Sequence, residues 1–375
     1  MKRIQLEQLI QQLKSTKVLL LSGPRLAGKE EMIHSALQTI GQEAFQINMG
    51  NKKEHRVLED ATANELIQTF QNFPIVIIHE AQYLGNLQSI IEEVLTGSIA
   101  STLVLSCSYE PLLDDVLKEV LEIQGLHFKI LPPSFYELAQ ANGLPQEEKL
   151  LEQRLIFGNY PPVAESMENA QEILTHLLDT VIVTDLGVTD RINKGDKLLR
   201  LLQVLAFTIG EPVSYNELAE KCDLDNETVE RYIQLLEKAY ILIHLNAFSS
   251  DKRYELKKSN MIFFYDNGLR NMLINNFNPH TLRNDLDSLW LNWLIAERMK
   301  WNNLQQKKAN YYFWRTHTRQ TIEFIEEFNG IMTGYKATWE KKKKLKFPKM
   351  FGDYYPSIVT HTLNRSTYWG FLTKK

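Results

Sequence analysis

A glycine-rich loop near the N-terminus has the residue types needed to hold a phosphate group. It reads Gly23, Pro24, Arg25, Leu26, Ala27, Gly28, Lys29, Glu30. An apolar run over 17–22 precedes it, and apolar residues at helical spacing over 31–40 follow it. Strand, glycine loop with lysine, then helix is the context that a phosphate-binding loop requires. Backbone N–H groups and the helix start attract the anion, and Lys29 would reach the β and γ phosphates of a nucleotide.

The residue after this lysine departs from the usual pattern. Phosphate-binding loops carry Ser or Thr there, and its hydroxyl holds Mg²⁺. Here the position is Glu30, whose carboxylate repels phosphate unless a metal lies between them. Two interpretations stay open. The loop binds a nucleotide such as ATP with a weakened Mg²⁺ site, or it is kept for its shape and the phosphate pocket is partly or wholly lost.

The next strong strand signal, over 73–78, leads into His79 and Glu80. In P-loop ATPases this strand ends in Asp-Glu, where the Asp supports the Mg²⁺ shell and the Glu activates the attacking water. Glu80 is therefore the candidate catalytic residue. His79 stands at the Asp position, although Mg²⁺ prefers oxygen ligands, and a polar cap at a strand end is its alternative role. A further strand over 102–106 ends in Ser106-Cys107-Ser108, where a polar residue could sense a γ-phosphate, although small polar residues are common at strand ends.

Alternating strands and helices over residues 1–140 predict a parallel, three-layer α/β domain of the P-loop NTPase class. Paired prolines at 132–133 and 161–162 mark its end, and residues 141–195 read as a helical linker or lid.

Residues 196–280 predict a winged helix-turn-helix. Helical patterns over 196–208, 214–222 and 225–239 are followed by strand patterns over 241–245 and 261–265. The third helix, which would enter the major groove of DNA, has a net charge of −2, a poor match to phosphate. The loop between the strands is basic, so some contact with DNA stays open beside a role in domain packing or protein contact. Its basic residues are Lys252, Arg253, Lys257 and Lys258.

Residues 281–375 predict a small α/β domain. A helix over 288–301 and strands over 311–315, 321–325 and 331–336 follow the layout of a metal-dependent nuclease core, the PD-(D/E)XK type. In that chemistry two carboxylates hold Mg²⁺ and a lysine polarises the phosphate. The candidates are Glu297, Glu323 and Lys336. Gly334 stands where the usual second acid belongs, so we expect no nuclease activity and assign no metal ligands.

Charge is divided unevenly along the chain. The 375 residues carry a net charge of −4, yet residues 291–375 hold 16 Lys or Arg against 6 Asp or Glu, and the first 290 hold the remaining 26 and 40. The basic quarter includes the run 341–344, which is either a solvated face or a nucleic-acid contact. Two cysteines and no apolar run of roughly 20 residues predict a cytoplasmic protein without a membrane partner.

Together these motifs resemble a bacterial and archaeal family of AAA-type ATPases. Its members join a P-loop domain to a C-terminal region with a winged helix and a restriction-endonuclease-like domain. The resemblance covers nearly the whole chain. It rests on the loop 23–30, similar to the family's Gly-Pro-Arg-Gln-Val-Gly-Lys-Thr, and on the segments 158–161, 228–232 with 236–237, 264–270 and 312–316.

The chain departs from this family mainly where chemistry is expected. The family Thr is Glu30, the family Asp is His79, a Gly-Arg pair is Gly125-Leu126, and a Glu-x-Lys is Gly334-Tyr-Lys336. Glu-Asn and Glu-Val-Asp likewise become Leu291-Asn292 and Thr321-Ile-Glu323. The leading hypothesis is an ATP-binding protein with weak or absent hydrolysis that acts through a protein partner. An active ATPase and a nucleic-acid-binding protein remain as alternatives.

Overall fold

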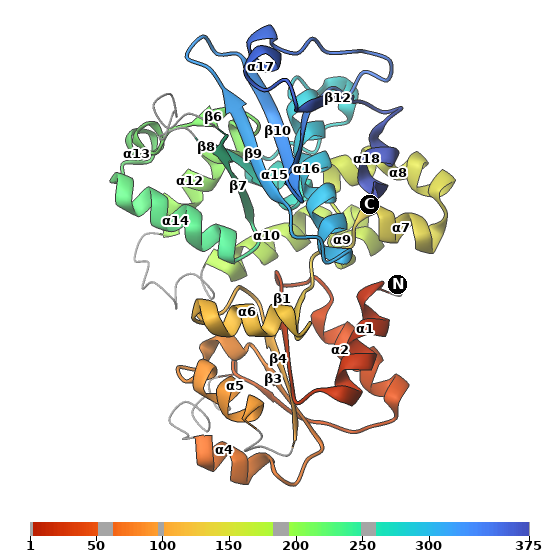
Figure 1. The fold of residues 1–375 in the computed structure, drawn as a ribbon, viewed down its shortest axis with the longest axis vertical. Helices are drawn as coiled ribbons and strands as arrows, with labels where there is room; N and C mark the ends of the chain where they lie inside the picture. Colours follow the sequence, from red (N-terminus) through yellow and green to blue (C-terminus); the bar gives the residue numbers. More distant parts are fainter. Residues whose placement is uncertain (1–2, 52–62, 97–100, 183–194, 249–259, 375) are drawn as a thin grey trace. The chain divides into compact units, whose positions relative to one another are not determined.

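The computed structural model describes residues 3–51, 63–96, 101–182, 195–248 and 260–374. The chain forms two compact units, Met1–Pro132 and Pro133–Lys375 (Figure 1). The basic wing residues Lys252, Arg253, Lys257 and Lys258 lie outside the described residues. Within the described ranges, no helix is both long enough and apolar enough to span a membrane.

The N-terminal unit is built on a five-stranded parallel sheet with the order β2-β3-β4-β1-β5. The central strands are mostly apolar and almost entirely buried, as expected for a sheet covered on both faces. Figure 1 shows α1 (Gln5–Ser15) and α2 (Lys29–Ile40) on one side of the sheet and α5 (Leu87–Leu95) and α6 (Asp115–Ile123) on the other. The predicted parallel α/β fold is therefore confirmed. The strands are β1 (Val18–Ser22), β2 (Phe45–Asn48), β3 (Ile75–His79), β4 (Thr102–Cys107) and β5 (His127–Lys129).

Helices α1, α2, α5 and α6 each bury a set of residues on one face. On α2, for example, the buried residues Met32, Ile33, Ala36 and Leu37 recur at helical spacing. The edge strands β2 and β5 have no counterpart among the sequence-based expectations, because both are short and only partly apolar. The helices are α1 (Gln5–Ser15), α2 (Lys29–Ile40), α4 (Ala63–Phe70), α5 (Leu87–Leu95) and α6 (Asp115–Ile123), with a 3₁₀ turn η1 (Ala81–Tyr83).

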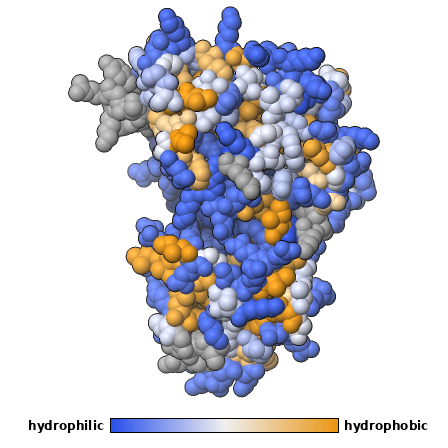
Figure 2. Space-filling view, turned by 45° about the vertical axis from the view of Figure 1, so that its right-hand side comes forward, coloured by the Kyte–Doolittle hydropathy of each residue, from blue (hydrophilic) through white to orange (hydrophobic). Residues whose placement is uncertain are grey.

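Hydrophobic side chains also reach the surface of the N-terminal unit, where Figure 2 shows orange patches among hydrophilic residues. Leu112, Val116 and Ile123 are each more than 70% exposed. Val116 and Ile123 are seven residues apart on α6 and therefore lie on the same side of that helix.

The C-terminal unit contains a seven-stranded sheet with the order β12-β11-β10-β9-β7-β8-β6. The helices and strands expected between 196 and 265 are present in their expected order, and the short strand β6 is added between α12 and α13. Their grouping as a winged helix stays a prediction. The strands are β6 (Pro212–Val213), β7 (Leu242–Ala247), β8 (Asn260–Phe264), β9 (Asn310–Arg315), β10 (Thr321–Phe328), β11 (Ile331–Ala337) and β12 (Val359–Leu363).

The boundary expected at residue 280 falls inside this sheet. Strand β7, from the segment expected to be a winged helix, pairs in parallel with β9, from the segment expected to be nuclease-like. Asn246 lies opposite Tyr312, and Phe248 N donates to Phe313 O at 2.6 Å. The segments expected at 141–195, 196–280 and 281–375 therefore pack as parts of one compact unit.

Helices cover this sheet and connect its strands. The longest, α16, buries Trp290 and Trp293, whose rings stack with their centroids 5.1 Å apart. The helices are α7 (Phe135–Asn142), α8 (Leu144–Phe157), α9 (Pro161–Glu165), α10 (Ala170–Thr180), α12 (Gly195–Phe207), α13 (Tyr215–Cys222), α14 (Asn226–Lys238), α15 (Asn267–Leu273), α16 (Leu286–Leu304), α17 (Lys349–Tyr354) and α18 (Tyr368–Thr373).

Candidate functional site

The predicted phosphate-binding loop forms the connection from β1 to α2, as expected. At its start, Gly23 lies against the backbone of Ile130, so that a Cβ at this position would be 2.0 Å from the Ile130 carbonyl oxygen. At its end, Gly28 has φ +91 and is the N-cap of α2. Only glycine adopts such backbone conformations without strain. The two glycines are therefore required by the path of the loop itself.

Lys29 is turned back onto its own loop. Its ammonium nitrogen Nζ donates to Gly23 O at 2.8 Å and to Pro24 O at 2.9 Å, and the residue is 7% exposed. Burial lowers the pKa of Lys29 from its ordinary 10.5 to about 8, although the nearby Glu80 carboxylate acts in the opposite direction. The two loop atoms that accept from this buried ammonium are uncharged carbonyl oxygens, and a phosphate would offer it a charged acceptor instead.

Glu80 follows β3 directly, at the carboxyl edge of the sheet, with φ +53. Its Oε1 accepts hydrogen bonds from Arg25 Nη1 at 3.1 Å and Ser108 Oγ at 2.8 Å. Its Oε2 accepts from Arg25 Nη2 at 3.1 Å and Gln82 Nε2 at 2.5 Å. The structure thus brings the phosphate loop, the candidate catalytic acid and the polar end of β4 into one network.

The pair at the usual Mg²⁺ positions consists of one carboxylate and one imidazole. The Glu30 side chain is 71% exposed, and its Oε1 lies 4.0 Å from His79 Nδ1. His79 Nε2 contacts Gln46 Oε1 at 3.1 Å. Both residues line an open hollow of about 370 Å³, together with Glu31, Ile33, His34 and Gln46.

This donor set does not fit Mg²⁺, which binds through carboxylates and phosphate oxygens in octahedral geometry. The hydroxyl and the aspartate that usually serve it are replaced by an exposed glutamate and a nitrogen donor. Within the described ranges, no three His, Cys, Asp or Glu side chains gather as a metal site would require.

Two of the three nuclease candidates of the C-terminal unit are in direct contact. Lys336 Nζ lies 3.2 Å from Glu323 Oε1 and donates to Thr321 O at 3.1 Å, so these two residues are paired on β10 and β11. Burial raises the pKa of the Glu323 carboxyl. Lys341–Lys344 are exposed in the segment between β11 and α17.

Glu297 has a different set of partners. It is 2% exposed on α16 and accepts hydrogen bonds from Asn159 Nδ2 at 3.1 Å, from Lys300 Nζ at 2.8 Å and from the backbone N–H of Phe135. Burial raises the pKa of its carboxyl. These contacts join α7, the α8–α9 connection and α16, so Glu297 anchors helices rather than presenting an open metal ligand.

Two of the sequence motifs meet in the C-terminal unit. Asp266, from the segment 264–270, accepts a hydrogen bond from Asn159 N at 2.8 Å and caps α15 through Gly268 N at 2.9 Å. Gly158 has φ +79, and a Cβ there would lie 2.0 Å from Asp266 Oδ1. The motifs at 158–161 and 264–270 are therefore in contact where α8 ends and α15 begins.

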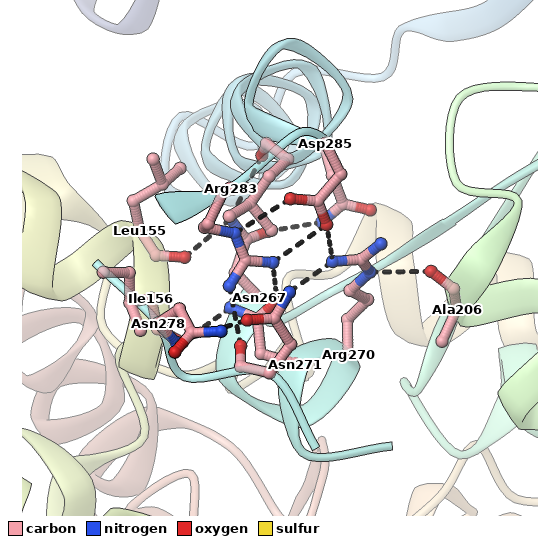
Figure 3. A network of polar contacts seen from close by, with 12 residues as sticks. Leu155, Ile156, Ala206, Asn267, Arg270, Asn271, Asn278, Arg283 and Asp285 are labelled. Carbon is pink, nitrogen blue, oxygen red and sulfur yellow. Dashed lines mark hydrogen bonds and ion pairs between the residues drawn. The ribbon is translucent and has the colours of Figure 1, made fainter. Parts of the chain in front are cut away.

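A second part of this junction is the polar network in Figure 3. Arg270 donates to Ala206 O at 2.7 Å and contacts Asp285, while Asn271 Nδ2 donates to Ile156 O at 2.8 Å. The network joins the ends of α8 and α12 to α15 and to the start of α16. These buried side chains satisfy helix-end carbonyls and stabilise the fold.

Comparisons with known proteins assign the N-terminal part of the chain. Residues 15–139 match the family model of an AAA domain. This match, together with the parallel α/β fold, supports an AAA-type P-loop domain over residues 15–139. Residues 148–280 match a domain of unknown function, DUF8612.

Individual relatives are distant. An uncharacterized protein of Haemophilus influenzae is 25% identical over 285 residues, which cover 71% of each chain. Among solved structures, the Walker-type ATPase of Pyrococcus abyssi is 12% identical with a TM-score of 0.42 and covers 72% of this chain and 94% of its own. The RuvB Holliday junction branch migration motor of Thermotoga maritima is 17% identical with a TM-score of 0.33 and covers 64% and 89%.

Sequence reasoning identified the loop, Lys29, Glu80 and the polar segment 106–108, and the structure places Ser108 of that segment beside Glu80. It missed the roles of Arg25 and Gln82. Gln82 lies two residues after Glu80, so its contact follows from the turn η1. Arg25 was expected only as a member of the loop. Its partner Glu80 is 55 residues away, and only the order of the strands brings the two together.

Proposed function

We propose that the AAA domain binds a nucleoside triphosphate at Gly23–Glu30 and hydrolyses it slowly or not at all. The observation that carries the proposal is that the loop keeps its two glycines and the buried Lys29 ammonium, while His79 places an imidazole where an aspartate is usual. The loop and the lysine supply phosphate recognition. Fast turnover needs a metal shell that Glu30 and His79 do not supply. The function is therefore one of binding rather than of rapid catalysis.

Calorimetric titration of the full chain with ATP in the presence of MgCl₂ tests the binding. We expect saturable binding, weakened about 100-fold or more in Lys29→Ala because a charge-assisted contact to phosphate is lost. Lys14→Ala removes an exposed lysine on α1 and serves as the matched control. Equal binding by Lys29→Ala and the wild type would place the ligand elsewhere and contradict the proposal.

Phosphate release tests the second half. We expect turnover well below the rate of about 1 s⁻¹ that is ordinary for such enzymes. A double variant, Glu30→Thr with His79→Asp, restores the usual oxygen donors, and we expect it to release phosphate at least tenfold faster. Wild-type turnover near 1 s⁻¹ that is lost in Lys29→Ala would show a working ATPase instead.

The pKa of Lys29 gives the binding a defined pH dependence. Because burial lowers this pKa to about 8, Lys29 is charged at pH 7 and mostly neutral at pH 9. Affinity for ATP should therefore fall about tenfold between pH 7 and pH 9, since the charged fraction falls by that factor. Calorimetry at both values measures it. In Lys29→Arg the charge does not titrate, so a fall of the same size in that variant would assign the effect to another group.

A further inference from the structure

Arg25 and Glu80 form a two-point ion pair across the candidate site. Nη1 lies 3.1 Å from Oε1 and Nη2 lies 3.1 Å from Oε2. The guanidinium also donates to Tyr83 OH at 3.4 Å. A guanidinium fork fits a carboxylate and a phosphate equally well, because both present two oxygens at the right spacing. Arg25 belongs to the loop that would surround the phosphates, so the same fork has two potential partners.

The carboxylate of Glu80 is fully occupied. Each of its oxygens accepts two hydrogen bonds, four in all, from Arg25, Gln82 and Ser108. A carboxylate has about four acceptor sites. A water molecule therefore finds no acceptor on Glu80 until one of these donors leaves. Gln82 and Ser108 follow β3 and β4, whereas Arg25 is the donor that lies in the phosphate loop.

We propose that Arg25 is a positioning residue that exchanges between Glu80 and the terminal phosphate of a bound nucleoside triphosphate. This exchange rests on the proposed nucleotide binding. It would let the site distinguish a nucleoside triphosphate from a diphosphate. A triphosphate offers Arg25 a new bidentate partner and releases Glu80. A diphosphate lacks that group, so Arg25 stays on Glu80. Glu80 is thus available to water only while a triphosphate is bound.

A double-mutant cycle on the full chain tests this exchange. The dissociation constants of ATP and ADP are measured by calorimetry for the wild type, Arg25→Ala, Glu80→Gln and the double variant. Glu80→Gln keeps the shape but removes the charge that competes for Arg25, so ATP should bind about tenfold tighter. Arg25→Ala should weaken ATP by about the same factor, while ADP affinity stays within about twofold in both variants.

The decisive comparison is Glu80→Gln in the Arg25→Ala background. If the glutamate acts by holding Arg25, ATP affinity there should change by less than about twofold. If Glu80 simply repels phosphate, the tenfold gain persists without Arg25, and the exchange is overturned. Equal effects of either single variant on ATP and ADP would also overturn it. Lys118→Ala, which removes a cation from α6, controls for net charge and should change neither affinity.

The same measurements distinguish a failure of the proposed nucleotide binding from a failure of the proposed exchange of Arg25. A wild type that binds neither nucleotide defeats both proposals. If Lys29→Ala weakens ATP binding but the effects of Arg25→Ala and Glu80→Gln on ATP affinity are independent of each other, only the exchange is contradicted.

Discussion

Replacing Glu297 with alanine should lower the free energy of unfolding of the C-terminal unit by about 3–5 kcal/mol. The change leaves the Lys300 ammonium, which is 3% exposed, without its carboxylate partner. It also removes the acceptor of the Phe135 N–H and of the Asn159 side-chain amide. Buried donors left without an acceptor each add to the loss.

Urea denaturation followed by tryptophan fluorescence measures this effect. All six tryptophans of the chain lie between 290 and 369, so the signal reports on the C-terminal unit alone. Glu340→Ala is the matched control, because that carboxylate is 65% exposed beside Lys343 and its removal should cost less than about 1 kcal/mol. A similarly small change for Glu297→Ala would mean that the carboxylate is not an anchor and would reopen its assignment as a ligand.

Replacing Gly158 with alanine should cost the same unit about 4 kcal/mol, through backbone strain and overlap together. Gly158 has φ +79 and ψ −166, a conformation that is essentially restricted to glycine. The added Cβ would lie 2.0 Å from Asp266 Oδ1. Asp266 cannot move aside without losing the hydrogen bonds from Asn159, Gly268 and Leu269.

The same fluorescence-detected denaturation applies here. Gly352→Ala is the control, since that glycine lies in α17 with open space where the Cβ would be, and alanine should be neutral or slightly stabilising. If Gly158→Ala unfolds at the same urea concentration as Gly352→Ala, the tight approach of the two motifs is not part of the folded protein.

Sequence reasoning succeeded where the signal is local. The order of strand, glycine loop, Lys29 and helix occupies one continuous segment, so the β1–loop–α2 unit was predicted and confirmed. The strands expected over 73–78 and 102–106 are likewise present as β3 and β4. The network around Glu80 was only partly accessible, because the contact with Arg25 depends on which strands become neighbours.

The C-terminal unit shows the opposite case. Glu297 on a helix, with Glu323 and Lys336 on strands, suggested a metal site, because these residue types occur in that order in nucleases. The structure gives Glu297 a backbone partner, Phe135, 162 residues away. Nothing in the local pattern distinguishes an acid that anchors helices from one that binds a metal. The pairing of β7 with β9 was equally hidden, since it joins segments that were interpreted as separate domains.

The single sheet of the C-terminal unit also limits how this chain can change in evolution. The pairing of β7 with β9 closes what would otherwise be two open strand edges, one on each side of residue 280. Recombination that exchanged one side without the other would leave unpaired backbone groups, and exposed edges of this kind promote aggregation. The two sides of the sheet are therefore expected to be inherited together.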